Sequence, residues 1–147
     1  MDRAFGKLNR KATEEAFKQY LLEWKPYRLK ALSKRPVVGS PSMDGQPNDG
    51  TPHDPDAGAA AYADAMRPCR EREGVCHTLA SISEEEEVLG DLLMHRFIMR
   101  WGSTRTMMYL NDKYGDYMSE RTFRDRQSQA LWEGALMCPD DSVRVPQ

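Results

Sequence analysis

A proline- and glycine-rich stretch, residues 36–57, divides this chain of 147 residues and limits what it can fold into. The stretch holds five of the nine prolines and three of the ten glycines, with almost no apolar side chains. Proline cannot donate a backbone hydrogen bond, and a segment so poor in apolar surface cannot offset the entropy lost on ordering. We therefore expect an extended or mobile linker over 36–57, with regular structure on either side.

The segment before the linker has the pattern of an amphipathic helix over residues 13–33. Thr13 and the two glutamates after it are typical of a helix start, and Pro26 should kink or split the helix. Ten basic and four acidic residues give residues 1–35 a net charge of +6, so we expect a basic helical arm. Its apolar stripe, at helical spacing, consists of Phe17, Tyr20, Leu21 and Trp24.

A second helix is predicted from Ala57 to Ser81. Its apolar residues roughly follow helical spacing, but Pro68 and Gly74 weaken the pattern and could divide it into two pieces. The helices on either side of the linker could fold together, or each could use the surface of a partner. The residues leave both arrangements open.

The third predicted helix has the clearest start. Ser83 precedes four consecutive glutamates, and Ser83 with Glu86 has the spacing of a capping box. A solvated first turn is the common role of such an acidic run, and an acidic contact surface for a protein partner is the alternative. The helix should end at Trp101-Gly102.

Two shorter helices complete the pattern. The first covers residues 103–114, and Gly115 suits the left-handed position after a helix end. Ser119 should cap the second, which runs to about Met137 and ends before Pro139.

These elements indicate an all-α protein. We divide it into a basic helical arm (1–35), a linker (36–57), a helical domain (58–138) and a tail (139–147). Within the domain, the three helices of residues 84–138 have the order and lengths of a helix-turn-helix unit, whose last helix would lie in the major groove of double-stranded DNA.

The charge distribution is compatible with this prediction, although the net charge of −2 is not that of a uniformly basic protein. Residues 36–91 carry three basic and twelve acidic groups, whereas residues 92–138 carry seven basic and five acidic groups. A DNA-binding protein needs a basic face where it meets phosphate, not a basic total.

The last helix separates polar from apolar side chains. When Phe123 faces inward, Glu120, Arg121, Thr122 and Asp125 point toward the bases, and the arginines beside them flank this face, in reach of phosphates. A solvated face of mixed charge is the alternative interpretation. The residues predicted to contact DNA are Ser119, Glu120, Arg121, Thr122, Arg124, Asp125, Arg126, Ser128, Gln129 and Arg105.

The run SERTFRDRQSQAL, residues 119–131, resembles the recognition helix of the region 4 module of bacterial sigma factors. There the pattern is Ser-x-x-Thr-Val-Arg-x-Arg-x-x-x-Ala-Leu. The preceding run LLMHRFIMRWGSTRTMMYLNDKYG resembles the leucine-rich helix, short loop and scaffold helix of that module.

A larger part of the chain, residues 15–137, resembles phage-encoded transcriptional regulators of the ArpU family. Those have a basic aromatic N-terminal helix, a Ser-Pro-Ser-x-Asp-Gly-x-Pro loop, a middle helix and a sigma-like helix-turn-helix. Here the aromatic helix spans 20–30, and SPSMDGQP occupies 40–47. The resemblance implies a (pro)phage regulator that activates late genes. The chain departs from the family in its acidic linker after Pro47 and its methionine-rich scaffold helix.

The sequence gives little support for a metal site or a catalytic site. Cys69, Cys76, His77 and Cys138 lack the spacing of a zinc site, and packed cysteines are the simpler interpretation. His95 has no nucleophile spaced to act with it, so we expect a packed or surface histidine. We predict neither an enzyme nor a bound cofactor or metal. The absence of a disulfide framework, signal peptide and apolar span favours the cytoplasm of a bacterial host.

The expected partners follow from this interpretation. A single helix-turn-helix usually binds DNA modestly, so a homodimer or tethering to host RNA polymerase would be needed. The alternative function is a helical protein–protein interaction module that does not contact DNA. In that case the stripe of Phe17, Tyr20 and Trp24 would dock on RNA polymerase or on a second copy.

Overall fold

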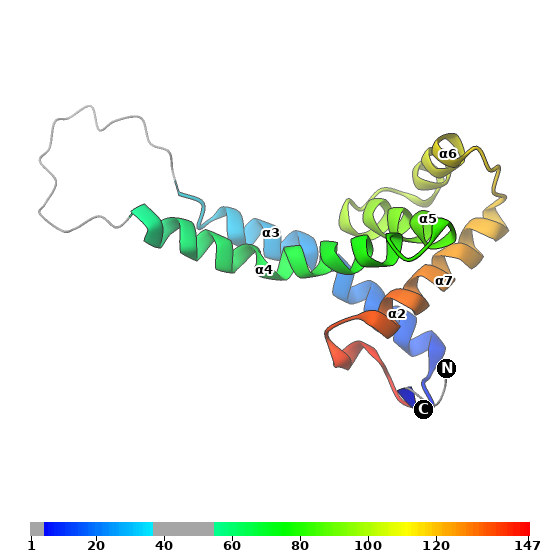
Figure 1. Cartoon of the computed structure of the whole chain (residues 1–147), viewed down its shortest axis with the longest axis horizontal. Coiled ribbons are helices and arrows are strands. Elements are labelled where there is room, and N and C mark those ends of the chain that lie inside the picture. Colours follow the sequence, from blue (N-terminus) through cyan, green and yellow to red (C-terminus); the bar gives the residue numbers. More distant parts are fainter. Residues whose placement is uncertain (1–4, 37–54) are drawn as a thin grey trace, which may run out of the picture.

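A computed structural model describes residues 5–36 and 55–147 (Figure 1). Within these ranges the regular elements are helices, apart from an isolated β-bridge between Leu8 and Pro146. The expected all-α class is therefore confirmed. Most of the predicted linker 36–57, including the SPSMDGQP motif, lies outside the described residues.

The N-terminal helix is split as Pro26 predicts. Helix α2 (Arg10–Leu22) begins earlier than expected, because the Asn9 side chain caps it by accepting from the backbone of Ala12. Helix α3 (Trp24–Leu32) follows after Glu23. Pro26 lies in the first turn of α3, where its missing N–H has no helical partner to lose.

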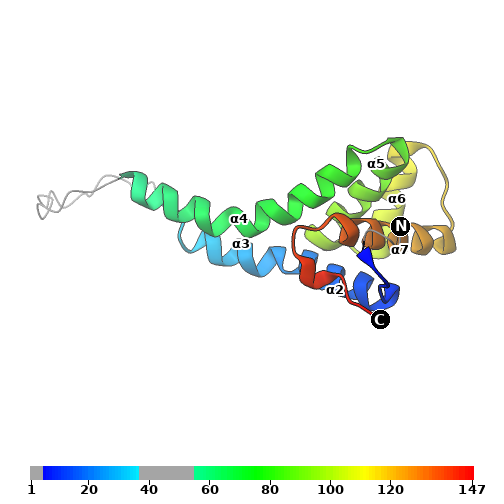
Figure 2. The ribbon, with the colours of Figure 1, turned by 60° about the horizontal axis from the view of Figure 1, so that its bottom comes forward.

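Helix α4 (Pro55–Ala80) is continuous, so neither Pro68 nor Gly74 divides it. It begins two residues before the expected Ala57, with a proline at the first helical position, where proline is well tolerated. Figure 2 shows that α4 bends near its middle, the usual effect of an internal proline. Buried residues on both sides of Pro68 hold the two halves in one packed helix.

The two helices that flank the linker fold together. Helices α3 and α4 lie side by side as a hairpin that projects from the rest of the molecule (Figures 1 and 2). Ala31 of α3 is buried with Met66 and Cys69 of α4. At the base of the hairpin, the buried Arg72 donates to the carbonyl of Tyr20 at 2.6 Å and to the carboxylate of Glu23 at 3.0 Å.

The last third follows the predicted order, with differences at the helix ends. Helix α5 (Glu84–Leu93) continues into a π-helical turn, η1 (Met94–Ile98), and ends before Trp101 because Arg100 adopts a left-handed conformation with φ of 60°. The Ser83 hydroxyl bonds to the Glu86 carboxylate instead of the backbone, so the capping box is incomplete. Helices α6 (Ser103–Tyr114) and α7 (Glu120–Met137) match their predicted ranges, and a short turn, η2 (Asp141–Val143), follows.

The main core includes α2. Phe17, Tyr20 and Leu21 are buried with residues of α4, α5, η1 and α7. Phe17 lies over Gly134 of α7, where no other residue would leave room for the ring. The stripe predicted as a docking surface for a partner therefore packs inside the chain, with Phe17 and Tyr20 fully covered and Trp24 partly so. Residues 10–32 are joined to the C-terminal helices by packing, despite the linker in the sequence.

Candidate nucleic-acid interface

The turn between α6 and α7 is held by side-chain bonds to its backbone. Gly115 ends α6 in the left-handed conformation, as expected, with φ of 67°. The Asn111 amide accepts from the backbone N–H of Met118 at 2.9 Å and donates to its carbonyl at 3.5 Å. Met118 is itself buried with Phe123 of α7 and Leu110 of α6. The direction in which α7 leaves the turn is therefore set by Asn111, which sequence inspection missed.

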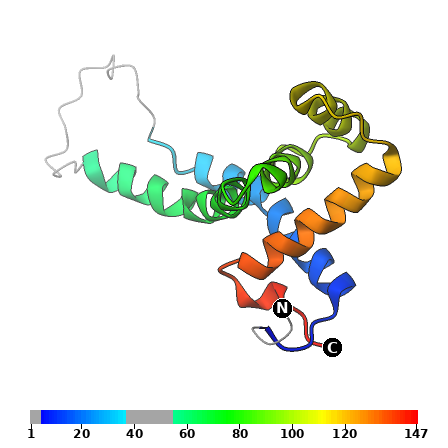
Figure 3. The ribbon, with the colours of Figure 1, turned by 45° about the vertical axis from the view of Figure 1, so that its right-hand side comes forward.

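The first turns of α7 present the predicted face. The Ser119 hydroxyl caps the helix by accepting from the backbone N–H of Thr122 at 3.2 Å. Glu120, Arg121, Arg124 and Asp125 are exposed. Figures 1 and 3 show this half of α7 projecting beyond α2, with its C-terminal half crossed by α2.

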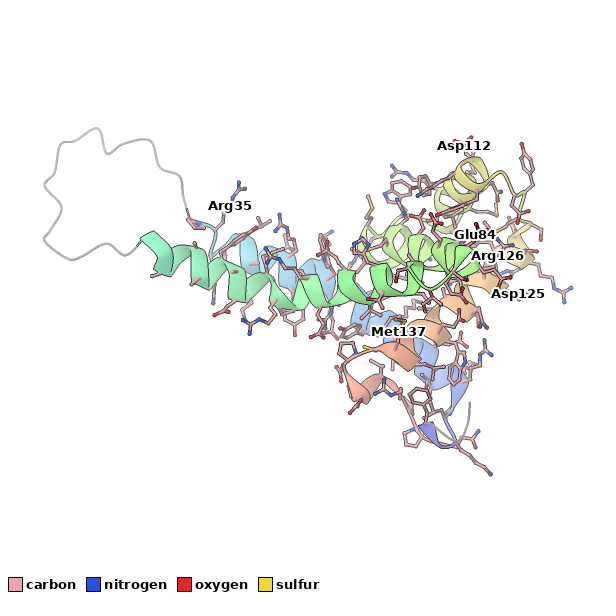
Figure 4. All side chains as sticks on the ribbon, viewed as in Figure 1. Arg35, Glu84, Asp112, Asp125, Arg126 and Met137 are labelled. Atoms are coloured by element: carbon pink, nitrogen blue, oxygen red, sulfur yellow. The ribbon has the colours of Figure 1, made fainter. Side chains whose placement is uncertain are left out.

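Thr122 and Arg126 are partly buried and already bonded. The Ser119 hydroxyl donates to the Thr122 hydroxyl at 3.1 Å, which holds the Thr122 side chain against the N-terminal cap of α7. Arg126 forms an ion pair with Asp116 of the turn at 3.1 Å. Figure 4 places Arg126 beside Asp125, with Glu84 of α5 near both labels. Arg126 therefore braces the turn against α7 and is less free to contact phosphate than predicted.

Two predicted contacts lie under α2. The Ser128 hydroxyl donates to the Glu14 carboxylate at 2.6 Å, and Arg10 donates to the Gln129 side chain at 3.1 Å. Arg10 also lies 5.3 Å from the ring centroid of Trp132. Ser128 and Gln129 were predicted to face outward toward DNA, but α2 crosses that face of α7 and engages both residues. The accessible part of the predicted interface ends near Asp125.

A cleft of about 240 Å³ separates the beginnings of α6 and α7. Residues from the first turns of both helices line it, so two helix N-termini, each with partial positive charge, face the same space. Such N-termini favour phosphate groups, and Arg124 adds a positive charge that the Glu120 carboxylate partly offsets. The lining residues are Ser103, Thr104, Met107, Glu120, Phe123 and Arg124.

Arg105 lies apart from this cleft. Its guanidinium sits 3.8 Å from the ring centroid of Trp101, and it is absent from the residues that line the cleft. Of the three arginines Arg105, Arg121 and Arg124, all predicted to contact DNA, only Arg124 lines the cleft.

The other flank of α7 is acidic. A groove of about 660 Å³ runs between the start of α5 and α7. Among the described residues that line it, the one basic residue, Arg126, is paired with Asp116. Phosphate would be repelled from this side. The charged residues that line the groove are Glu84, Glu85, Glu87, Asp116, Asp125 and Arg126.

Asp91 joins α5 to the end of α6. Its carboxylate accepts from Lys113 at 2.7 Å and from the Tyr114 hydroxyl at 2.9 Å. The hydrogen bond to Asp91 raises the pKa of Lys113, while burial, followed by the same carboxylate, raises the pKa of Tyr114 to about 12. His95 lies 2.9 Å from Asp91 and is partly buried, in agreement with a packed role. The available sequence signal was an aspartate four residues before a histidine, within a predicted helix.

The remaining predicted features fall outside this interface. Cys69, Cys76 and Cys138 are buried and unpaired, and burial raises the pKa of the Cys76 thiol to about 12. Among residues 5–36 and 57–147, no three His, Cys, Asp or Glu side chains are grouped so as to hold a metal ion. None of the described helices combines the length and apolar character needed to cross a membrane.

Comparisons with known protein families, with curated proteins and with solved structures find no match for this chain.

Proposed function

We propose that this chain binds double-stranded DNA as a sequence-specific transcription regulator, with residues 84–138 acting as a sigma-region-4-like helix-turn-helix and α7 as its recognition helix. The resemblance to ArpU-family phage regulators extends the proposal to activation of late genes of a (pro)phage. In this proposal α6 is the scaffold helix, and the 115–119 turn sets the angle between the two.

One observation carries the proposal. The first two turns of α7 are capped and present an exposed polar face, and they project from the protein on a turn that Asn111 and Met118 hold. The N-terminal residues of a recognition helix are those that usually meet base edges in the major groove. Here they are Glu120, Arg121, Arg124 and Asp125, a set with donors for guanine and acceptors for cytosine.

The charges also favour one orientation on DNA. In the part of the chain that the structure describes, the cleft between α6 and α7 combines two helix N-termini and Arg124 with a single acid, Glu120, whereas five acids and one paired arginine line the groove on the opposite flank. A phosphate backbone would therefore run along the cleft, with the acidic groove turned away from it. Lys11 and Lys18 of α2 lie beside α7 at Gln127 and Ser128 and could neutralise phosphates farther along the duplex.

A selection from random-sequence duplexes tests this proposal. The full chain should retain an enriched motif, and its affinity should fall by at least tenfold between about 50 mM and about 200 mM salt, because several phosphates are neutralised. The double variant Arg121→Ala with Arg124→Ala should lose the motif. Its control is Asp64→Ala with Arg67→Ala, which removes an exposed ion pair on α4. If a folded sample shows neither an enriched motif nor salt-dependent binding, the proposal is wrong.

A further inference from the structure

Tyr117, in the turn between α6 and α7, is the exception among the six tyrosines of the chain. The other five are buried or partly covered: Tyr20, Tyr27, Tyr62, Tyr109 and Tyr114. Tyr117 is 91% exposed, more than any other large apolar or aromatic residue in the described ranges. The DNA contacts proposed for Arg121 and Arg124 leave this ring unused, so its exposure calls for a different explanation.

The exposure of Tyr117 does not come from a loosely held backbone. The backbone N–H of Met118 donates to the carbonyl of Asp116 at 3.1 Å, which places Tyr117 at the centre of a three-residue γ-turn. The same N–H donates to the amide oxygen of Asn111 at 2.9 Å, so the γ-turn is fastened to α6. The turn therefore presents the Tyr117 side chain from a fixed backbone position.

Both neighbours of Tyr117 in the sequence are held by other parts of the chain. Asp116 forms the ion pair with Arg126 of α7 at 3.1 Å. Met118 is buried in the small core between α6 and α7. Since the backbone is held on both sides, a partner has only the two side-chain torsions of Tyr117 to fix. The entropy lost on binding the ring would therefore be small.

Tyr117 also lies directly ahead of the proposed recognition helix. Consecutive Cα atoms are about 3.8 Å apart, so the Cα of Tyr117 lies within about 8 Å of the Cα of Ser119, the cap of α7. Figures 1 and 3 show residues 115–119 at the outer edge of the molecule, beside the projecting end of α7. A helix that enters the major groove by its N-terminus brings the turn before it close to the phosphates that border the groove.

Tyrosine suits the sugar–phosphate backbone in this place. Its hydroxyl can donate to a phosphate oxygen, and its ring can pack on the adjoining sugar, without adding charge. The adjacent acid, Asp116, is paired with Arg126, and this pairing reduces the repulsion between its carboxylate and a phosphate.

We propose that Tyr117 is a further DNA-contact residue, whose hydroxyl donates to a backbone phosphate at the start of α7. This inference rests on the proposed function, because it needs α7 to enter the major groove. A phosphate contact carries no sequence information, and a neutral donor displaces no counterion. Tyr117 should therefore strengthen binding to every duplex alike, without changing the preferred motif or the salt dependence.

Competition binding with the selected duplex and with an unrelated duplex tests this contact in the full chain. Tyr117→Phe should weaken binding to both duplexes by about fivefold, because a hydrogen bond to a charged group is lost. Tyr117→Ala, which also removes the ring, should weaken it by about tenfold or more. The slope of log affinity against log salt should stay that of the parent, in contrast to Arg124→Ala. The matched control is Tyr27→Phe, which removes a hydroxyl from α3 and should bind like the parent.

Circular dichroism and thermal unfolding check that the variants fold. If Tyr117→Ala loosens the turn, Tyr117→Phe still provides the test, because it keeps the ring and removes only an exposed hydroxyl. Binding by Tyr117→Phe within twofold of the parent overturns the contact. A loss confined to one position of the motif also overturns it, since Tyr117 would then contact a base.

The failure of this inference differs from that of the proposed function. A parent chain that binds duplex DNA, together with Tyr117 variants that bind equally well, overturns the Tyr117 contact alone. A folded parent chain that binds no DNA overturns both.

Discussion

At the residue scale, the placement of the helices depends on a few residues whose role is geometric. Asn111 bonds both backbone groups of Met118, and Gly90 allows α5 to approach α4 closely. Arg72 is buried yet bonded by all of its guanidinium nitrogens, to two carbonyls and the Glu23 carboxylate. Each of these residues determines where a helix lies, and none would contact DNA.

Arg124→Ala tests the phosphate contact expected at the cleft. The variant should bind all duplex sequences several-fold more weakly, and the slope of log affinity against log salt should decrease by about 1, because one fewer counterion is released. Arg67→Ala, which removes another exposed arginine, from α4, should leave the slope unchanged. A change in preferred sequence at constant slope would instead indicate that Arg124 contacts a base.

Gly90→Ala should destabilise the fold by at least about 2 kcal/mol, because the added carbon would overpack a helix crossing. The new Cβ would lie 2.5 Å from the carbonyl oxygen of Cys76 and 2.8 Å from the backbone nitrogen of Ala80, neither of which can rotate away. Gly74→Ala meets no atom within 4 Å and should stabilise α4 slightly. Urea unfolding of both variants measures the difference, and equal midpoints would contradict the close packing.

At the element scale, α2 and Asp91 determine what α6 and α7 can do. Helix α2 crosses the C-terminal half of α7 and engages Ser128 and Gln129, so only the N-terminal half can enter a groove. Asp91 ties the end of α6 to α5 through Lys113 and Tyr114. The Asp91 carboxylate therefore helps to fix the orientation of α6, together with the buried packing of Leu110 against Leu92 and Phe123.

Ser128→Ala tests whether α2 remains over Ser128 when DNA binds. Because the Ser128 hydroxyl already donates to Glu14, its removal should leave the duplex affinity within about twofold and cost about 1 kcal/mol of stability. Competition binding and thermal unfolding provide the two readouts. A large loss of affinity with unchanged stability would show that α2 moves aside when DNA binds.

The burial of Tyr114, together with its hydrogen bond to Asp91, predicts that stability depends on pH at high pH. Folding raises the pKa of Tyr114 from 10.0 to about 12, so the folded state holds the phenolic proton more tightly than the unfolded chain does. This stabilisation is fully present below pH 10 and is lost as the pH rises toward 12. The free energy of unfolding should therefore fall over this interval, and less steeply in Tyr114→Phe. Equal slopes in the parent and in Tyr114→Phe would show that Tyr114 does not cause this loss of stability.

At the scale of the whole molecule, one core joins segments from both sides of the linker. Phe17 and Leu21 of α2 are buried with Leu79 of α4 and Ala130 of α7, and the α3–α4 hairpin extends from this junction (Figure 3). The C-terminal tail returns to α2, where the backbone N–H of Val145 donates to the Thr13 hydroxyl at 3.0 Å. The C-terminal helices therefore complete their core with the N-terminal ones.

A fragment of residues 55–147 should not fold cooperatively. It would lack the aromatic and leucine side chains of α2, and removing a single buried phenylalanine already costs about 3–5 kcal/mol. Circular dichroism should show a broad, low-temperature transition compared with the full chain. A sharp transition near that of the full chain would mean that 58–138 is an autonomous domain.

Helix positions could be predicted from the sequence, because capping residues, prolines and periodicity act over a few neighbours. Ser119, Gly115 and Pro26 each have the predicted role. Pro68 was misjudged, since packing on both sides of it keeps α4 continuous. The start at Arg10 was missed because Asn9 caps the helix ahead of Thr13.

The sequence by itself determined an all-α chain and an amphipathic last helix with an exposed, charged beginning. Only the tertiary structure decided that α2 covers Ser128 and Gln129 and that the Phe17 stripe lies inside. The reason is distance along the chain: Ser128 and Glu14 are 114 residues apart. Periodicity identifies which face of a helix is polar, but it cannot identify the neighbour that a distant segment brings to that face.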